Sequence, residues 1–153
     1  MDRNRLGSLP ETFGIKWTKL RKIDLSYNDL QSLPETFGKN WTALTRIDLS
    51  GNTTAELPKT FGDTWTALTE IHLQNRLTKL PETFGDAWTE LTKIDLSYNN
   101  LQSLPETFGH TWTALTNIDL RENKLKRLPD KFGYTWIVLP KIYLDTLGHV
   151  TKR

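Results

Sequence analysis

The chain has 153 residues, of which 37% are hydrophobic and 25% charged, with a formal net charge of +2 and a pI near 8.8. This length suits one domain with a sizeable core, and this balance of charge points neither to disorder nor to a polyanionic partner. No apolar run is long enough to cross a membrane, the first residues lack a signal-peptide pattern, and there is no cysteine. We therefore expect no membrane or nucleic-acid partner, no disulfide or thiolate metal site, and a cytoplasmic location.

One unit of 23 or 24 residues recurs along the whole chain. A leucine opens each unit, and the other apolar positions keep their places within it. One unit cannot bury its own apolar side, whereas stacked units can cover one another. We expect a single domain over residues 1–153, with a partial unit at 1–19, full units from 20, 44, 68, 91 and 115, and a partial unit at 139–153. The opening leucines are Leu20, Leu44, Leu68, Leu91, Leu115 and Leu139.

Each unit begins with the pattern of a short strand. In the first full unit Ile23 and Leu25 are two residues apart, so both side chains point into the core. Lys22, Asp24 and Ser26 alternate with them and are predicted to point to the opposite, solvent-facing side.

The second half of each unit has helical spacing. Phe37, Trp41 and Leu44 are four and three residues apart, and Pro34 is a favourable first residue of a helix. Gly38 follows the phenylalanine, and a glycine recurs there in every unit. It either ends the turn in a left-handed conformation or permits close approach of two backbones. We expect a short helical turn up to the glycine and then a connection whose tryptophan either belongs to the core or stacks on the convex face.

The repeated motif LxxIxLSxNxLxxLPxxFG, as in LTKIDLSYNNLQSLPETFG, resembles the leucine-rich repeat from about Arg5 to Leu144. Its LPxxFG portion is similar to the LPxxLG of plant and bacterial intracellular types, with FGxxW in place of LGxL. The resemblance implies an α/β solenoid, a right-handed arc with a parallel sheet on the concave face and short helical turns and loops on the convex face. It also implies a buried ladder of asparagines, which ends where Leu147 takes the position. The ladder residues are Asn4, Asn28, Asn52, Asn75, Asn99 and Asn123.

Two neighbouring units are irregular. The third full unit has only Gln74 between Leu73 and Asn75, one residue fewer than the others, and Thr54 occupies a position that is leucine elsewhere. Drift between copies is the simpler explanation, and a surface bent for a partner is the alternative.

The concave face carries the candidate functional residues, because the core does not dictate them. One column contains mainly aspartates and the adjacent one mainly cations, so the two columns could simply neutralise each other. Alternatively they form a binding surface for a cationic or mixed-charge protein or peptide, with tyrosines as anchors and Glu70 and His72 setting specificity. The proposed contact residues are Asp24, Tyr27, Arg46, Asp48, Glu70, His72, Lys93, Asp95, Tyr98, Asn117, Asp119, Arg121 and Tyr143.

Catalysis and metal binding find little support. His72, His110 and His149 fall at different places of the repeat, and no phosphate-binding glycine loop or metal-ligand cluster is present. Stacked carboxylates do not converge as calcium requires, and the neighbouring Lys and Arg compete with a cation. We expect a non-enzymatic protein-binding module without a metal or cofactor.

Self-association is the alternative function. Tyr134, Ile137 and Val138 place apolar groups where other units are polar or small, and Met1 falls inside a unit, so uncapped ends could pair. The favoured interpretation is that Leu147 and Val150 fold back as a makeshift cap. A fragment or a consensus-like chain is also possible, because two units differ only at Arg21/Thr92 and Asp29/Asn100.

Overall fold

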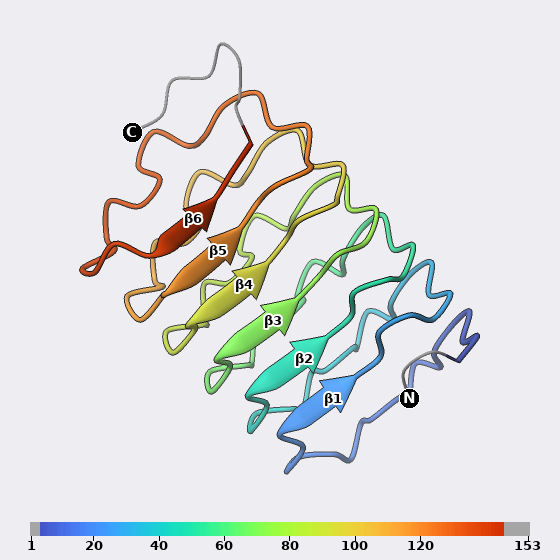
Figure 1. Cartoon of the computed structure of the whole chain (residues 1–153). Helices are drawn as coiled ribbons and strands as arrows, with labels where there is room; N and C mark the ends of the chain where they lie inside the picture. Colours follow the sequence, from blue (N-terminus) through green and yellow to red (C-terminus); the bar gives the residue numbers. More distant parts are fainter. Residues whose placement is uncertain (1–3, 146–153) are drawn as a thin grey trace.

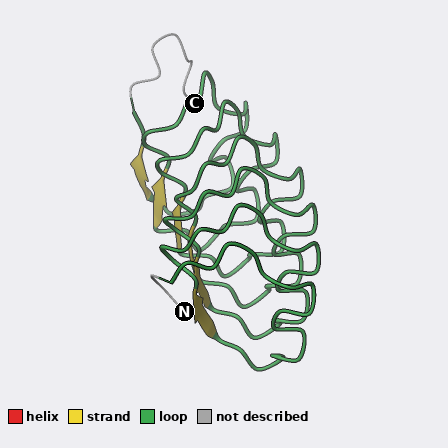
Figure 2. Ribbon diagram, turned by 90° about the vertical axis from the view of Figure 1, so that its right-hand side faces the viewer, coloured by secondary structure: helices red, strands yellow, loops and turns green. Residues whose placement is uncertain are grey.

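A computed structural model describes residues 4–145, in which the chain winds into a solenoid with one short strand per turn (Figure 1). The strands form one six-stranded parallel sheet in the order β1-β2-β3-β4-β5-β6. Loops close each turn on the side away from the sheet and bow outwards (Figure 2). The parallel-sheet solenoid expected from the sequence is confirmed. The strands are β1 (Lys22–Asp24), β2 (Arg46–Asp48), β3 (Glu70–His72), β4 (Lys93–Asp95), β5 (Asn117–Asp119) and β6 (Lys141–Tyr143).

The strands pair in the register that the repeat predicts. The central isoleucine of each strand lies opposite the next one, and Ile47, Ile71 and Ile118 are fully buried. Backbone bonds continue past the strand ends, as where the Leu25 amide donates to the Asp48 carbonyl at 2.8 Å. Backbone hydrogen bonds between turns therefore extend beyond the three residues of each strand.

The buried asparagine ladder is confirmed at Asn28, Asn52, Asn75 and Asn99. Asn123 makes the same bonds while half-buried, whereas Asn4 is exposed, so the prediction of burial is wrong there. Asn52 donates from Nδ2 to the carbonyls of Leu25 and Leu49, at 3.0 Å each, and its Oδ1 accepts the Leu30 amide at 2.9 Å. One buried amide thus satisfies backbone groups of its own and the preceding turn, as a buried polar group requires. The predicted end of the ladder at Leu147 lies outside the described residues.

The expected helical turns are not helices, because residues 4–145 contain no helix. Each loop segment is instead a series of turns closed by backbone hydrogen bonds between residues three apart. The Phe37 amide donates to the Pro34 carbonyl at 2.9 Å, and the Trp41 amide donates to the Gly38 carbonyl at 3.1 Å. The reason is Gly38, whose φ of +69° is left-handed and interrupts any helix after one turn.

The FGxxW motif builds a second ladder between turns. The indole Nε1 of Trp65 donates to the carbonyl of Gly38 in the preceding unit at 2.8 Å, and its ring stacks on Trp41 with centroids 6.3 Å apart. A Cβ on Gly38 would lie 2.5 Å from the Trp65 ring, so the glycine also permits the close approach. Both interpretations of this glycine are therefore correct. The same indole bond is made by Trp41, Trp88, Trp112 and Trp136.

The irregular units stay well packed. Thr54 is 3% exposed, and its hydroxyl donates to the Leu30 carbonyl at 3.1 Å, so the polar substitution in the core is satisfied. Among the tryptophans and the leucines that open the units, Trp17 is 40% exposed and Leu139 is 82% exposed, while Leu20 and Trp136 are half-buried. The assignment of the opening leucine to the core is wrong at Leu139. Trp17 stacks on Trp41 with ring centroids 6.2 Å apart, which is the stacking that the sequence allowed as the alternative to a core position.

Replacing Trp65 by Phe tests the indole ladder. The change removes the bond to Gly38 and leaves a void, so we expect the free energy of unfolding to fall by about 2 kcal/mol. Trp17→Phe is the matched control, since within residues 4–145 the Trp17 indole donates no hydrogen bond. Urea denaturation measures both, and equal losses would contradict a role for the indole bond.

Candidate functional site

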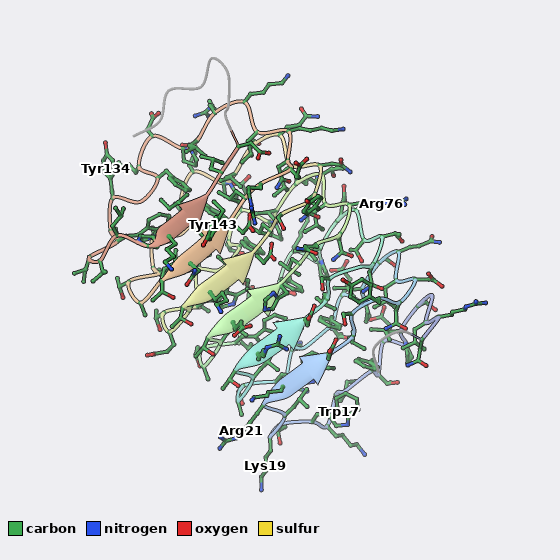
Figure 3. The ribbon with its side chains drawn as sticks, in the orientation of Figure 1. Trp17, Lys19, Arg21, Arg76, Tyr134 and Tyr143 are labelled. Atoms are coloured by element: carbon green, nitrogen blue, oxygen red, sulfur yellow. The ribbon has the colours of Figure 1, made fainter. Side chains whose placement is uncertain are left out.

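The two predicted columns lie side by side on the solvent face of the sheet, because they occupy the first and third positions of each strand. Figure 3 shows the side chains along the sheet, with Tyr143 of β6 labelled. The strand register aligns each residue with its counterpart in the next unit, as predicted, and neighbouring strands are about 4.8 Å apart. The first column is Asp24, Asp48, His72, Asp95, Asp119 and Tyr143. The second is Lys22, Arg46, Glu70, Lys93, Asn117 and Lys141.

The aspartates also stabilise the turns that follow their strands. Oδ1 of Asp24 accepts the amide of Ser26 at 2.9 Å and its hydroxyl at 2.5 Å, and Asp95 holds Ser97 in the same way. Ser26 and Ser97 are 5% and 1% exposed. The prediction that Ser26 faces solvent is therefore wrong, and the Asp-x-Ser spacing was the signal for this local bond. One oxygen of each of these carboxylates remains outside the serine bond.

These bonds shift the titration of Asp24. Partial burial raises its pKa, but the hydrogen bonds from the Ser26 hydroxyl and amide, aided by the charge of Arg46, outweigh burial and hold the pKa below its ordinary value. Asp24 is thus held as a carboxylate.

The most connected group spans β2 and β3. Nε2 of His72 lies 2.6 Å from Oε2 of Glu70, and Nε of Arg46 donates to the same oxygen at 3.3 Å. Nη2 of Arg46 is also 4.0 Å from Oδ2 of Asp48. Burial alone raises the pKa of Glu70, but the hydrogen bond and charge of His72, with the charges of Arg46 and Lys93, lower it overall. We call Arg46, Asp48, Glu70 and His72 the central network.

Gln74 belongs to the site and was missed from the sequence. Its Nε2 donates to Oδ2 of Asp95 at 3.0 Å and to Oγ of Ser97 at 2.9 Å, which links the irregular unit to the next one. The missing residue next to Gln74 was the sequence feature that could have pointed to a role for its side chain. In the other units the missing position holds a left-handed residue, such as Gly51 with φ +75°.

A second group lies towards the C-terminal end of the face. The Arg121 guanidinium donates to both Asp119 oxygens, at 3.0 Å from Nε and 2.7 Å from Nη2, and lies 5.0 Å from the centroid of the Tyr143 ring. Although burial raises the pKa of Asp119, the Arg121 bonds lower it overall. These three residues form the C-terminal cluster.

Tyr27 and Tyr98 lie on turns after the strands rather than in the columns. Their φ values are 55° and 57°, and 52% and 63% of their surfaces are exposed. The Tyr27 ring packs over Gly51, where a Cβ would be only 2.6 Å from Cδ1 of the tyrosine. A left-handed conformation costs a non-glycine residue about 1–2 kcal/mol, and such strain concentrates at functional sites.

The predicted site residues thus divide rather than converge on one point. The central network and the C-terminal cluster are each held by direct contacts, while Asn117 bonds only the Thr116 hydroxyl among its side-chain partners in residues 4–145. No group of three or more His, Asp or Glu in this range is placed to hold a metal ion. No helix within it is long and apolar enough to cross a bilayer. The arrangement is an extended polar surface with aromatic rims.

The comparisons with known proteins agree with this architecture. The leucine-rich repeat model matches residues 1–53, 66–125 and 89–135. A Leptospira interrogans leucine-rich-repeat protein is 26% identical, with a TM-score of 0.74 over 94% of this chain and 35% of that one. A solved structure of the Toll–Spatzle complex of Drosophila matches with 26% identity and a TM-score of 0.71, over 95% of this chain and 23% of that one.

The APL1 leucine-rich repeat domain shares the fold at 21% identity and a TM-score of 0.75, with 81% of this chain and 32% of that chain covered. The chain therefore spans about a quarter to a third of the length of these solved structures. The search of the curated proteins found no match. The fold and site define a parallel β-solenoid repeat protein. The chain belongs to the leucine-rich repeat family.

Glu70→Gln tests the central network through pH. The pKa of Glu70 is lowered on folding, so the stability it contributes is present above its ordinary value of 4.5 and is lost as pH falls through the lowered value. At neutral pH the free energy of unfolding of the wild type should exceed that of the variant by less than about 1 kcal/mol. This difference in stability should shrink below pH 4.5. Denaturation across pH measures it, and a constant difference would rule out the Glu70 contribution.

Proposed function

We propose that the chain is a non-enzymatic module that binds a protein or peptide partner through its concave face. The observation that carries this proposal is the central network, where charged side chains are held in place by one another without contributing to the core. Fixed side chains lose less conformational entropy on binding, so a network of this kind provides a preorganised surface.

The family supports this class of function, because leucine-rich repeat domains generally mediate protein–protein interaction. The exposed tyrosines at the rims belong to a residue type that often dominates interface energy. Mixed charge in the two columns favours a partner that also carries both signs. We further propose a cytoplasmic location, which rests on the absence of cysteine alone.

The double variant His72→Ala/Tyr98→Ala tests this proposal. Neither side chain belongs to the core, so Tyr98→Ala should change the free energy of unfolding by at most about 0.5 kcal/mol. His72→Ala also removes the bond to Glu70 and should cost about 1 kcal/mol. Partner affinity should fall at least about 30-fold if one of them is an interface hot spot. Crosslinked capture from cells, followed by titration of the captured protein against each variant, measures the effect.

The matched control removes the same residue types from the loop face, His110→Ala/Tyr134→Ala. A partner that both the wild type and the control retain, and that the concave-face variant loses, would support the proposal. A large drop in melting temperature of the concave-face variant would instead show that these residues maintain the fold.

A second candidate function is self-association, which one observation favours. Ile137, Val138 and Leu139 are 83%, 70% and 82% exposed, and Tyr134 next to them is 56% exposed. Exposed apolar side chains gathered in one place commonly mark an interaction surface. The capping role assigned to Leu147 and Val150 lies outside the described residues.

Ile137→Thr/Val138→Ala tests self-association, because these are the residues that the preceding unit carries as Thr113 and Ala114. If the wild type dimerises through the patch, light scattering after size exclusion should show a concentration-dependent mass that the variant loses. A wild type that stays monomeric at high concentration would eliminate this function.

A further inference from the structure

Charge on one lateral edge of the solenoid is separated by sign. This edge lies beyond the C-terminal ends of the strands, where Arg76 projects outwards (Figure 3). Three aligned segments of the third, fourth and fifth full units, 76–79 (RLTK), 100–103 (NLQS) and 124–127 (KLKR), carry five cations and no acid. The corresponding segments of the first two full units, 29–32 (DLQS) and 53–56 (TTAE), carry two acids and no cation. We call the five cations the cationic edge: Arg76, Lys79, Lys124, Lys126 and Arg127.

The positions of the cationic edge are exposed in the repeat itself. In each of the three segments the second residue is a buried leucine, Leu77, Leu101 or Leu125. The third and fourth residues are exposed in all five full units. Exposure here is therefore a property of every turn and does not depend on an end of the solenoid.

Backbone hydrogen bonds hold the three segments in register. The Asn100 amide donates to the Leu77 carbonyl at 2.8 Å, and the Lys124 amide donates to the Leu101 carbonyl at 2.9 Å. Backbones bonded in this way lie about 5 Å apart, so the two cationic segments are about 10 Å from each other. The uncharged segment 100–103 lies between them as a polar strip with cations on both sides.

Two of the five cations form ion pairs within residues 4–145. Nζ of Lys79 lies 3.7 Å from Oε1 of Glu56, and Nη2 of Arg127 lies 2.9 Å from Oε1 of Glu106. All four of these side chains are more than half exposed, so the pairs contribute little and can exchange for carboxylates of a partner. The cations without an ion pair in this range are Arg76, Lys124 and Lys126.

Solubility alone does not account for this pattern. A surface that only keeps a protein soluble mixes both signs of charge, whereas these three segments carry one sign. The formal net charge of the chain is +2, so five cations in twelve aligned positions are a local concentration and not a general excess. A patch of one sign attracts a partner of the opposite sign.

The polar strip favours a peptide over other anions. Asn100 and Gln102 each offer a donor and an acceptor, and these match the C=O and N–H groups of a peptide backbone. Phosphate and sulfate oxygens only accept hydrogen bonds from amide or hydroxyl groups, so they leave the side-chain amide oxygens unmatched. The three segments also contain no aromatic residue on which a nucleic-acid base could stack.

We propose that the cationic edge is a second binding surface, distinct from the central network, for an extended acidic peptide segment. The peptide crosses segment 100–103, where the side-chain amides of Asn100 and Gln102 bond its backbone. Its Asp or Glu carboxylates pair with the cations of segments 76–79 and 124–127. Residues three apart in an extended chain are separated by about 10 Å, so two acidic residues at this spacing reach both cationic segments.

The test titrates the whole chain with a fluorescein-labelled peptide that contains two pairs of acidic residues separated by two uncharged residues. Fluorescence polarisation measures the affinity. A peptide with asparagine and glutamine in place of the acids should show no saturable binding, because it cannot pair with the cations.

Two variants replace the cations of one flanking segment by the residues of segment 100–103, so each variant should fold. Removing the two cations of segment 76–79 should weaken binding about fivefold, and removing the three of segment 124–127 about tenfold. The variants are Arg76→Asn/Lys79→Ser and Lys124→Asn/Lys126→Gln/Arg127→Ser.

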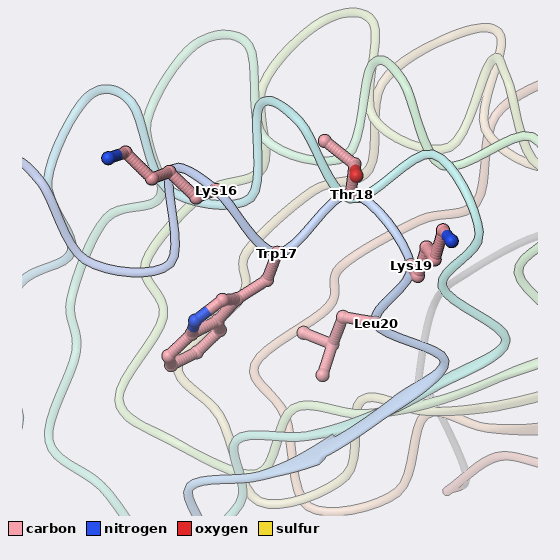
Figure 4. Close-up of a pocket in the computed structure, with 5 residues that line it drawn as sticks. All are labelled: Lys16, Trp17, Thr18, Lys19 and Leu20. Atoms are coloured by element: carbon pink, nitrogen blue, oxygen red, sulfur yellow. The ribbon is translucent and has the colours of Figure 1, made fainter.

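The matched control removes three cations near the start of the chain, Lys16→Asn/Lys19→Ala/Arg21→Thr, with the residues that the next unit carries at these positions. Lys16 and Lys19 lie on the loop of the first turn, beside Trp17 and Leu20 (Figure 4). Because salt screens charges beyond about 8 Å, the affinity of the control should stay within about twofold of wild type.

Equal weakening by the control and by the variant of segment 124–127 would reduce the effect to net charge and overturn the site. The absence of saturable peptide binding to the wild type would overturn the proposal, and saturable binding of heparin or single-stranded DNA in its place would assign the edge to another polyanion. The concave-face variant His72→Ala/Tyr98→Ala should bind the peptide as the wild type does, so this surface and the concave face are tested independently.

Discussion

In every turn of this solenoid, many backbone N–H and C=O groups lie outside any helix or long strand and need other hydrogen-bond partners. With three-residue strands and no helix in residues 4–145, side chains have to supply much of the bonding between turns. Asn52, Trp65 and Thr69 each reach back to carbonyls of the preceding unit, at the strand end, at the loop side and before the strand respectively. Three ladders at separate places thus fix each unit on its neighbour.

The tryptophan ladder combines the most constraints in one residue. Trp65 packs edge-on against Phe61 of its own unit at 4.8 Å, stacks on Trp41, and bonds the Gly38 carbonyl. The bond requires the tight approach that only a residue without a Cβ allows, and the left-handed φ of Gly38 orients that carbonyl. Phe, Gly and Trp therefore recur together because each is needed for the other two, and in the turns where the tryptophan is fully buried the Phe and Trp side chains cannot contact a partner.

The sequence predicted the parallel sheet, its register, the asparagine ladder and both surface columns, because these depend on spacing alone. It could not predict how side chains on the surface pair with one another. Asp95 looked like a free surface carboxylate, whereas Oδ1 holds Ser97 and Oδ2 accepts from Gln74. The helical turn was predicted from residue spacing, and the left-handed glycine within the same segment prevented it. Exposure at Trp17 and Leu139 likewise depends on which units cover a position, and a repeat pattern contains no such information.

The third full unit shows that its irregularities are coupled rather than independent. Glu70 and His72 stand where the next unit has Lys93 and Asp95, so the acidic position has moved to the neighbouring column. Arg46 of the preceding strand then finds Glu70 within 3.3 Å, and His72 bonds the same carboxylate. This unit also lacks the left-handed residue that the other full units carry after the position of Gln74. Here the side-chain amide of Gln74 bonds Asp95 and Ser97 of the next unit. Drift would leave unmatched charges at some of these positions, whereas each change here has a partner: Glu70 pairs with Arg46 of β2, His72 bonds Glu70 of its own strand, and Gln74 bonds Asp95 of β4. The irregular unit is therefore the part of the concave face whose side chains are most completely fixed by one another, which is the physical property that a selective binding surface requires.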